Sequence, residues 1–143
     1  MTSFIQRVAK LGANALLGVF TSSGGFDGAF KELRVVAIKA GSVTATLPVT
    51  KPLCNSYGTL HGGAAATLVD IVGTMALLTK DPRRAGVSVD INTSYLRAAK
   101  EGEELLITGQ VLKTGKKLGF TQVDIARKSD NEVLVTGRHT KAL

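Results

Sequence analysis

Asn55-Ser-Tyr-Gly-Thr-Leu-His-Gly-Gly63 leads directly into the longest apolar run of the chain, Gly62 to Thr79, which carries a single acid, Asp70. The Ala- and Leu-rich composition of this run predicts a helix from about Gly62 to Lys80, which Asp81-Pro82 ends. Because the helix is apolar nearly all round, we expect it to be buried on most sides. A carboxylate in the middle of such a helix is costly unless it has partners or a chemical use, so Asp70 is the first candidate for a functional residue.

Extended segments are predicted on both sides of this helix. Leu33 to Ala40 is predicted to be a strand, and residues 42–49 alternate apolar and polar side chains, as in a half-buried strand. Further strands are predicted around residues 87–92, 105–111, 118–125 and 133–137. In the segment 118–125 the apolar phase slips between Phe120 and Val123, which indicates a bulge or burial on both faces. The order of elements predicts an α+β domain in which a mostly antiparallel sheet curls around one buried helix.

The N-terminal region is predicted to add a helix to this core. Apolar residues recur at helical spacing over residues 3–19, and a Gly- and Ser-rich loop follows. This helix either packs on the domain or is a targeting or membrane-surface segment. With 143 residues the chain fits a single domain, in which residues 1–29 hold the N-terminal helix and loop and residues 30–143 the core. No apolar stretch is long and clean enough to predict a membrane span.

Composition excludes several classes of function. The single cysteine, Cys54, excludes an internal disulfide and a Cys-rich zinc site. With only two histidines, His61 and His139, a histidine-based metal site would need carboxylates to complete it, and no metal is predicted. The net charge of +7 predicts attraction to an anionic partner. Because aromatic residues make up only 5% of the chain and Trp is absent, a nucleic-acid-binding surface is not expected.

The loop before the helix contains the groups needed for acyl-bond cleavage. Glycine at positions 62 and 63 lets a carbonyl approach the backbone closely, and the first N–H groups of a helix have no intrahelical acceptor. Together with the helix dipole, these N–H groups form an oxyanion site from backbone alone. Asn55 can hold a water molecule or simply form a turn, and a lone histidine such as His61 is weak evidence for acid–base chemistry.

The chain resembles the hotdog-fold acyl-CoA thioesterases. Within them it is similar to the branch that contains acyl-CoA thioesterase 13 (thioesterase superfamily member 2) and the bacterial phenylacetate-pathway thioesterases. The resemblance covers roughly residues 30–142 and rests on the element order and on Asn55, Gly58-Thr-Leu-His-Gly-Gly63, Asp70, Gly86-Val-Ser-Val-Asp90 and Gly137-Arg-His-Thr-Lys141. It implies a hotdog fold and hydrolysis of an acyl-CoA thioester without a metal or organic cofactor.

The resemblance also assigns roles to single residues. It makes Asp70 the general base or the nucleophile, and the Gly62 N–H the oxyanion donor. Asn55 then holds the attacking water. His61 donates a hydrogen bond that shapes the loop, or contacts the thioester, and Ser88 binds substrate or water near Asp70. The route through an activated water is slightly favoured over a mixed anhydride on Asp70.

The spacing of Gly62 and Asp70 indicates a site shared by two subunits. Eight residues of helix separate them by roughly 12 Å along the axis, too far for both to reach one carbonyl within a single chain. We therefore expect a homodimer in which one subunit gives Asn55 and the Gly62 N–H, and the other gives Asp70 and Ser88. The hotdog family is likewise dimeric, usually paired again into a homotetramer.

Basic residues are candidates to bind the phosphates of coenzyme A, with lysines acting as point charges and arginines as forks. The candidates are Arg97, Lys113, Lys116, Lys117, Arg138 and Lys141. The acyl group cannot be read from the sequence: medium- or long-chain fatty acyl-CoA and aromatic acyl-CoA both fit the branch. The expected compartment is cytoplasmic, with mitochondrial or peroxisomal as the alternatives.

Two rival hypotheses remain at the level of the sequence. Cys54 and His61 could form a nucleophile pair, although a lone cysteine beside such a loop is more often passive. The chain could also be a hotdog subunit that binds acyl-CoA without hydrolysing it, which the presence of Asn55, Gly62 and Asp70 argues against. Dehydratases share the fold, but they usually place a histidine on the active helix, where this chain has Asp70.

Overall fold

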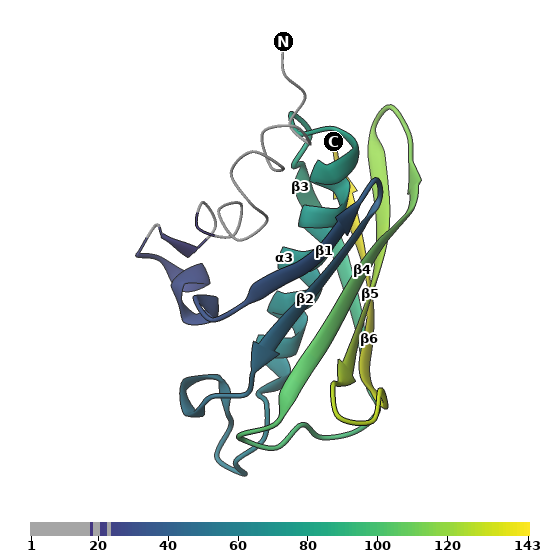
Figure 1. The fold of residues 1–143 in the computed structure, drawn as a ribbon. Coiled ribbons are helices and arrows are strands. Elements are labelled where there is room, and N and C mark those ends of the chain that lie inside the picture. The colour runs from purple at the N-terminus through teal and green to yellow at the C-terminus, as the bar shows by residue number, and fades with distance from the viewer. Residues whose placement is uncertain (1–17, 19–20, 23) are drawn as a thin grey trace.

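The computed structural model describes residues 18, 21–22 and 24–143 (Figure 1). Apart from Gly18, the helix predicted over residues 3–19 lies outside these residues. The elements that follow are two short 3-10 helices, one long helix and six strands. In chain order they are η1 Phe26–Phe30, β1 Arg34–Lys39, β2 Ser42–Pro48, η2 Lys51–Leu53, α3 Gly62–Lys80, β3 Val87–Tyr95, β4 Glu104–Thr114, β5 Leu118–Arg127 and β6 Val133–Ala142.

One antiparallel sheet holds all six strands in the order β1-β2-β4-β5-β6-β3. The sheet curves along α3, so that the helix lies in its concave face (Figure 1). The buried residues of α3 include thirteen of its nineteen positions, from Ala64 to Thr79. The predicted α+β hotdog architecture, with a curved antiparallel sheet around one long helix, is confirmed, and the predicted bounds of the helix agree with α3.

Glycines in the sheet bring α3 unusually close to the strands. A Cβ atom on Gly137 of β6 would lie 2.6 Å from Val69 Cγ2, and one on Gly109 of β4 would lie 2.9 Å from the backbone oxygen of Val72. Contacts this short are not tolerated, so only glycine permits this approach. The close packing fixes the depth and rotation of α3, and therefore the position of Asp70 relative to β6.

Apolar burial explains why α3 is a core helix. By length and composition alone the helix could cross a membrane, but 67% of its most apolar stretch is buried inside the protein. Its buried residues pack with inward-facing side chains of the strands, among them Val43, Leu105 and Val123, which are fully buried. The hydrophobic effect therefore places the helix inside the sheet.

The strand β3 forms one edge of the sheet and is exposed along almost its whole length. Its apolar side chains Val87, Val89 and Tyr95 are 74%, 59% and 55% exposed. Only β6 pairs with β3 among the described residues, so the other edge of β3 presents free backbone groups. A long edge with exposed apolar side chains is a template for pairing with another chain.

The irregular spacing of apolar residues in β5 comes neither from a bulge in β5 nor from burial of both its faces. Residues 119, 121, 123 and 125 of β5 are all buried, so this strand alternates regularly, with Thr121 facing in and Phe120 only half-buried. The irregularity lies in β4, where the register shifts between Val111 and Lys113 opposite Phe120 and Thr121. An extra residue in the partner strand is a bulge that the sequence of β5 could not reveal.

Candidate active site

The start of α3 leaves the backbone N–H groups of Gly62 and Ala64 without a described partner. His61 is the N-cap residue, with extended backbone angles, and its Nδ1 accepts a hydrogen bond from the Gly63 N–H at 2.8 Å. The structure describes no partner for the Gly62 N–H, whereas the Gly62 carbonyl accepts a hydrogen bond from the Tyr95 hydroxyl at 2.8 Å. His61 therefore shapes the loop as an acceptor rather than as the expected donor. Its cap engages the Gly63 N–H and leaves the Gly62 N–H, at the first position of the helix, available to an oxyanion.

Asn55 holds the loop that precedes this helix start. Its Oδ1 accepts hydrogen bonds from the backbone N–H groups of Tyr57 and Thr59, and its Nδ2 donates to Thr59 Oγ1 at 3.0 Å. This is a turn-forming pattern. Asn55 also lines the same pocket as Gly62. One amide hydrogen of Asn55 is left over for a ligand, because the amide has two and the loop uses one.

Asp70 lies on the face of α3 that faces the edge strand β3. Its side chain is 43% exposed in a single chain, so this carboxylate is the most accessible group of the central part of the helix. Thr74, one turn further along, donates its hydroxyl to Asp70 Oδ1 at 3.2 Å. The shallow pocket around Asp70 is lined by Thr67, Ile91, Thr93 and Tyr95. The Asp70 carboxylate is therefore held by Thr74 on one side and open to solvent on the other.

A buried histidine links Ser88 to Asp70. His139 of β6 is 1% exposed, its Nε2 lies 2.7 Å from Ser88 Oγ, and its Nδ1 lies 3.7 Å from Asp70 Oδ1. Burial lowers the pKa of His139, and the Asp70 carboxylate opposes that shift. The ring is therefore neutral at neutral pH. A carboxylate near Nδ1 favours the tautomer with its proton there, so that Nε2 accepts the Ser88 hydroxyl.

Lys141, two residues further along β6, is also buried, at 5% exposure. Its Nζ donates to Thr74 Oγ1 at 2.8 Å. Burial lowers the pKa of Lys141, and Asp70 opposes this shift as well. This placement does not suit the expected role of Lys141 as a surface ligand for a phosphate, because its ammonium group is turned into the protein. Lys141 belongs instead to the surroundings of Asp70.

Tyr95 is a site residue that sequence reasoning missed. It lines the pocket of about 390 Å³ that contains Asn55 and Gly62, and also the pocket that contains Asp70. Its hydroxyl bond to the Gly62 carbonyl ties the start of α3 to the end of β3. A tyrosine at the end of an amphipathic strand carries no sequence signal of such a contact, because the contact depends on how the strand crosses the helix.

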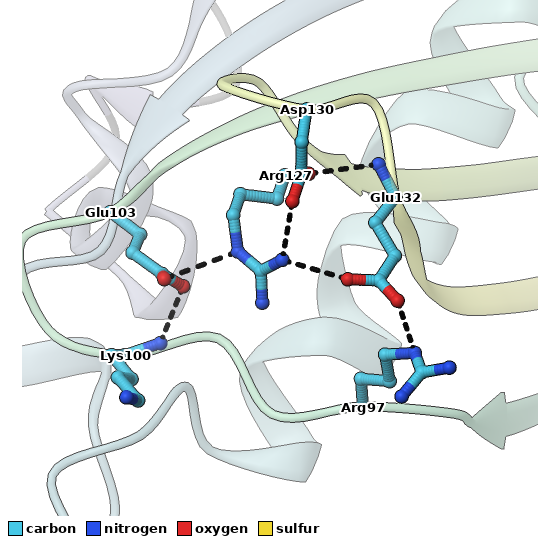
Figure 2. Close-up of polar contacts among 6 residues, drawn as sticks. All are labelled: Arg97, Lys100, Glu103, Arg127, Asp130 and Glu132. Carbon is cyan, nitrogen blue, oxygen red and sulfur yellow. Dashed lines mark hydrogen bonds and ion pairs between the residues drawn. The ribbon is translucent and has the colours of Figure 1, made fainter.

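The basic candidates do not form one cluster. Arg97 lies at the pocket of Asn55 and Gly62 and forms an ion pair with Glu132. Figure 2 shows that Glu132 also binds Arg127, which in turn contacts Glu103 and Asp130. Arg97 is thus part of a local ion-pair network, and its side chain is still 63% exposed. Arg138 is exposed on β6, between the buried residues Gly137 and His139.

Lys113, Lys116 and Lys117 lie at the opposite end of the molecule, in the hairpin between β4 and β5 near the end of α3 (Figure 1). All three are exposed. Arg84 joins them, because its Nη2 donates to the carbonyl oxygens of Gly115 and Lys116 at 3.1 and 2.6 Å. Sequence reasoning missed Arg84, which is distant in the chain. This group of residues, Arg84, Lys113, Lys116 and Lys117, is called the basic hairpin below.

The structure gives no support to Cys54 as a nucleophile. Its Sγ donates to the Thr50 carbonyl at 3.3 Å, and His61 Nδ1 is already engaged by the Gly63 N–H. Burial raises the pKa of the Cys54 thiol, and Glu101 raises it further. A nucleophilic cysteine needs a lowered pKa and an adjacent base. Cys54 has neither among the described residues.

The fold and this site define a hotdog protein with a free backbone N–H at the start of its long helix and an accessible carboxylate on the same helix. The chain belongs to the thioesterase superfamily, whose family model matches residues 57–134. This confirms the family resemblance inferred from the loop and helix motif and places the chain among thioester-cleaving enzymes.

Similar proteins span the whole chain. Acyl-coenzyme A thioesterase 13 of Homo sapiens is 40% identical over 143 residues, which is 100% of this chain and 99% of that protein. The crystal structure of zebrafish thioesterase superfamily member 2 is 38% identical, with a TM-score of 0.90, and the match covers 100% of this chain and 99% of that one. A hypothetical thioesterase from Streptococcus pneumoniae TIGR4, solved with coenzyme A, is 25% identical, with a TM-score of 0.74 over 79% of this chain and 89% of that one.

Proposed function

We propose that this protein hydrolyses an acyl-CoA thioester to a free acid and coenzyme A, with Asp70 as the catalytic carboxylate and the Gly62 N–H as the oxyanion donor. The observation that carries the proposal is the pairing of a free N–H at the start of α3 with an accessible carboxylate on the same helix. Membership in the superfamily and the name of the human relative support acyl-CoA as the substrate. No metal or organic cofactor is needed, because backbone and carboxylate supply the chemistry.

The reaction we infer uses water as the nucleophile. Asp70 accepts a proton from water as the oxygen attacks the thioester carbonyl, and the carbonyl π electrons move to oxygen, where the Gly62 N–H stabilises the charge. Collapse of this intermediate breaks the C–S bond, and the CoA thiolate takes the proton from Asp70. In the alternative, Asp70 attacks and forms a mixed anhydride. When water opens this anhydride at the Asp70 carbonyl, a single turnover leaves solvent ¹⁸O in the Asp70 carboxylate, whereas the direct route labels only the product acid.

Two subunits are proposed to complete each site. Gly62 and Asp70 are separated by about 12 Å along the helix, and in one chain they line different pockets. The exposed edge strand β3 offers a pairing surface for a second copy, with Val87, Val89 and Ile91 exposed on it. Pairing of β3 with β3 of a second copy in a two-fold dimer would cover these side chains and the open side of Asp70. A tetramer formed from two such dimers is the further expectation.

The acyl chain is proposed to enter the apolar pocket beside the helix start. This pocket of about 260 Å³ is lined by Phe26, Phe30, Leu53 and Ala64, and it also touches Gly63. Its apolar lining and its place next to the oxyanion donor suit a medium- or long-chain acyl group. An aromatic acyl group is the alternative that the same lining accepts.

The function is tested by measuring free-thiol release from a panel of short-chain, long-chain and aromatic acyl-CoA thioesters. We expect release with at least one of them, and the thioester with the highest kcat/KM identifies the acyl class. Tight binding of acyl-CoA without thiol release from any member of the panel would contradict the proposal and favour the non-hydrolytic acyl-CoA-binding protein.

The basic hairpin is proposed to bind the phosphates of coenzyme A. Its position near the end of α3 is about 15 Å along the helix from Asp70, a distance that the extended pantetheine arm can span. The triple variant Lys113→Ala/Lys116→Ala/Lys117→Ala is expected to raise KM for acyl-CoA about tenfold, since exposed ion pairs contribute up to about 1 kcal/mol each. Added salt should raise KM in the wild type and have little effect in this variant.

Two controls separate phosphate binding from damage to the site. The same acyl group on N-acetylcysteamine carries no phosphate, so its KM should not change in the triple variant. Lys128→Ala removes an exposed lysine that pairs with Glu104 far from the hairpin and should leave KM for acyl-CoA unchanged. An equal rise in KM for both thioesters would rule out the basic hairpin as the phosphate site.

A further inference from the structure

A chain of two hydrogen bonds connects a buried lysine to Asp70. Lys141 Nζ donates to Thr74 Oγ1 at 2.8 Å, and Thr74 Oγ1 donates to Asp70 Oδ1 at 3.2 Å. Lysine is almost never fully buried unless it is paired. Among the described residues, however, Lys141 makes no direct ion pair with a carboxylate. Its only described side-chain partner is the hydroxyl that faces Asp70.

The directions of the two bonds follow from the chemistry of the groups. An ammonium group can only donate, so Thr74 Oγ1 must accept from Lys141. The hydroxyl proton of Thr74 is then free to be donated to the Asp70 carboxylate, which can only accept when ionised. A threonine inside a helix more often bonds the carbonyl four residues earlier. Here the Thr74 hydroxyl donates to the side chain of the residue four positions earlier, Asp70, and not to its carbonyl. The bond from Lys141 holds the hydroxyl in this orientation.

We propose that Lys141 is a positioning residue that acts through Thr74 to fix a donated hydrogen bond on the Asp70 carboxylate. The inference rests on the proposed function, in which Asp70 must be ionised to accept a proton. A positive charge nearby and a donated hydrogen bond both stabilise a carboxylate. Lys141 and Thr74 are themselves buried, which strengthens both effects on the side of Asp70 that they face.

The other groups around Asp70 do not replace this charge. On β6, His139 faces Asp70 as well, but burial lowers its pKa and so disfavours its charged form. On β3, Asp90 adds a negative charge near His139. On β5, the buried side chain facing this region is Thr121, which bonds the His139 carbonyl and carries no charge. Among the described residues Lys141 is therefore the one buried cation close to Asp70.

Thr74 offers a matched pair of variants. Thr74→Val keeps the shape and removes the hydroxyl, whereas Thr74→Ser keeps the hydroxyl. We expect Thr74→Val to move the acidic limb of the pH profile of kcat/KM to higher pH by about one unit, the scale on which such interactions act. Thr74→Ser should leave the limb at its wild-type position. A purely structural role would lower kcat/KM at every pH without moving the limb.

Lys141→Met tests the other end of the chain, because methionine fills similar space without charge. It should move the limb in the same direction as Thr74→Val. The double variant should move it no further than the larger single shift, because the lysine acts through the hydroxyl. Additive shifts, or a limb that stays in place in folded Thr74→Val, would overturn the proposal. If Lys141→Met does not fold, the Thr74 pair decides alone.

The same series separates this inference from the proposed function. Absence of thiol release by the wild type would contradict the proposed function before any variant is compared. Wild-type activity with an acidic limb that is identical in Thr74→Val and Thr74→Ser would leave the thioesterase in place and remove the role of Lys141.

Discussion

Asp70→Asn is expected to lower kcat/KM for the best acyl-CoA by about 10³-fold, within the range that a general base contributes. Asparagine has the size of aspartate and can still accept the Thr74 hydroxyl through its carbonyl oxygen, so the surroundings of residue 70 are preserved. It cannot accept the proton of the attacking water, and it cannot form an anhydride. Most of the loss is expected in kcat, because substrate binding does not depend on this proton transfer. Thiol release under saturating and limiting substrate gives both constants.

The matched control is Asp81→Asn, at the other end of the same helix. Asp81 pairs with the exposed Arg83 and lies in no contact with Asp70. We expect its kcat to stay within about twofold of the wild type, as for surface substitutions remote from the chemistry. Unfolding temperature and oligomeric state should match the wild type in both variants. Wild-type kcat in a folded Asp70→Asn protein would show that another group acts as the base.

Gly62→Pro is expected to lower kcat by about 10²- to 10³-fold, the usual cost of losing one oxyanion donor. Proline has no N–H, and it is favoured at the first position of a helix. The preceding His61 has φ −62° and ψ 136°, which is the extended conformation that a residue before proline adopts. The substitution therefore removes the proposed donor while the helix start can be kept.

Gly62→Ala is the control that keeps the N–H. A Cβ at this position would meet the Tyr95 ring at 3.5 Å, which is ordinary van der Waals contact. Alanine should therefore retain most of kcat. Equal losses in the alanine and proline variants would mean that the space at Gly62, and not its N–H, is what the reaction needs. Circular dichroism confirms that α3 is intact in each.

The sequence was sufficient to predict the helix, the strands and the antiparallel architecture. The apolar run with its stop at Asp81-Pro82 predicted α3, and the alternation in residues 42–49 predicted β2, because these patterns are local. The bulge in β4 and the exposure of β3 were not predicted. Both depend on which strands become neighbours, and neither leaves a periodic signal in its own segment.

The candidate site shows the same division between local and long-range information. The cap of His61 on Gly63 lies within one loop, so the motif was sufficient to draw attention to it. The contacts of Lys141 and Thr74, by contrast, join residues 67 positions apart, and they exist only because β6 lies against α3. For the same reason Lys141 looked like one more basic residue near the C-terminus. Asn55 combines both kinds of information. Its turn contacts are local, whereas its place in the pocket depends on segments that are distant in the sequence.

The central claim is that each site takes the oxyanion donor from one subunit and the carboxylate from the other. The direct measurement is thiol release by purified heterodimers that carry Gly62→Pro in one subunit and Asp70→Asn in its partner, isolated through two different affinity tags. One of the two sites then receives an intact Gly62 and an intact Asp70, so we predict about half of the wild-type activity per dimer, as two-fold symmetry requires. Activity no higher than that of the two mutant homodimers, in heterodimers of confirmed composition, would contradict the shared site.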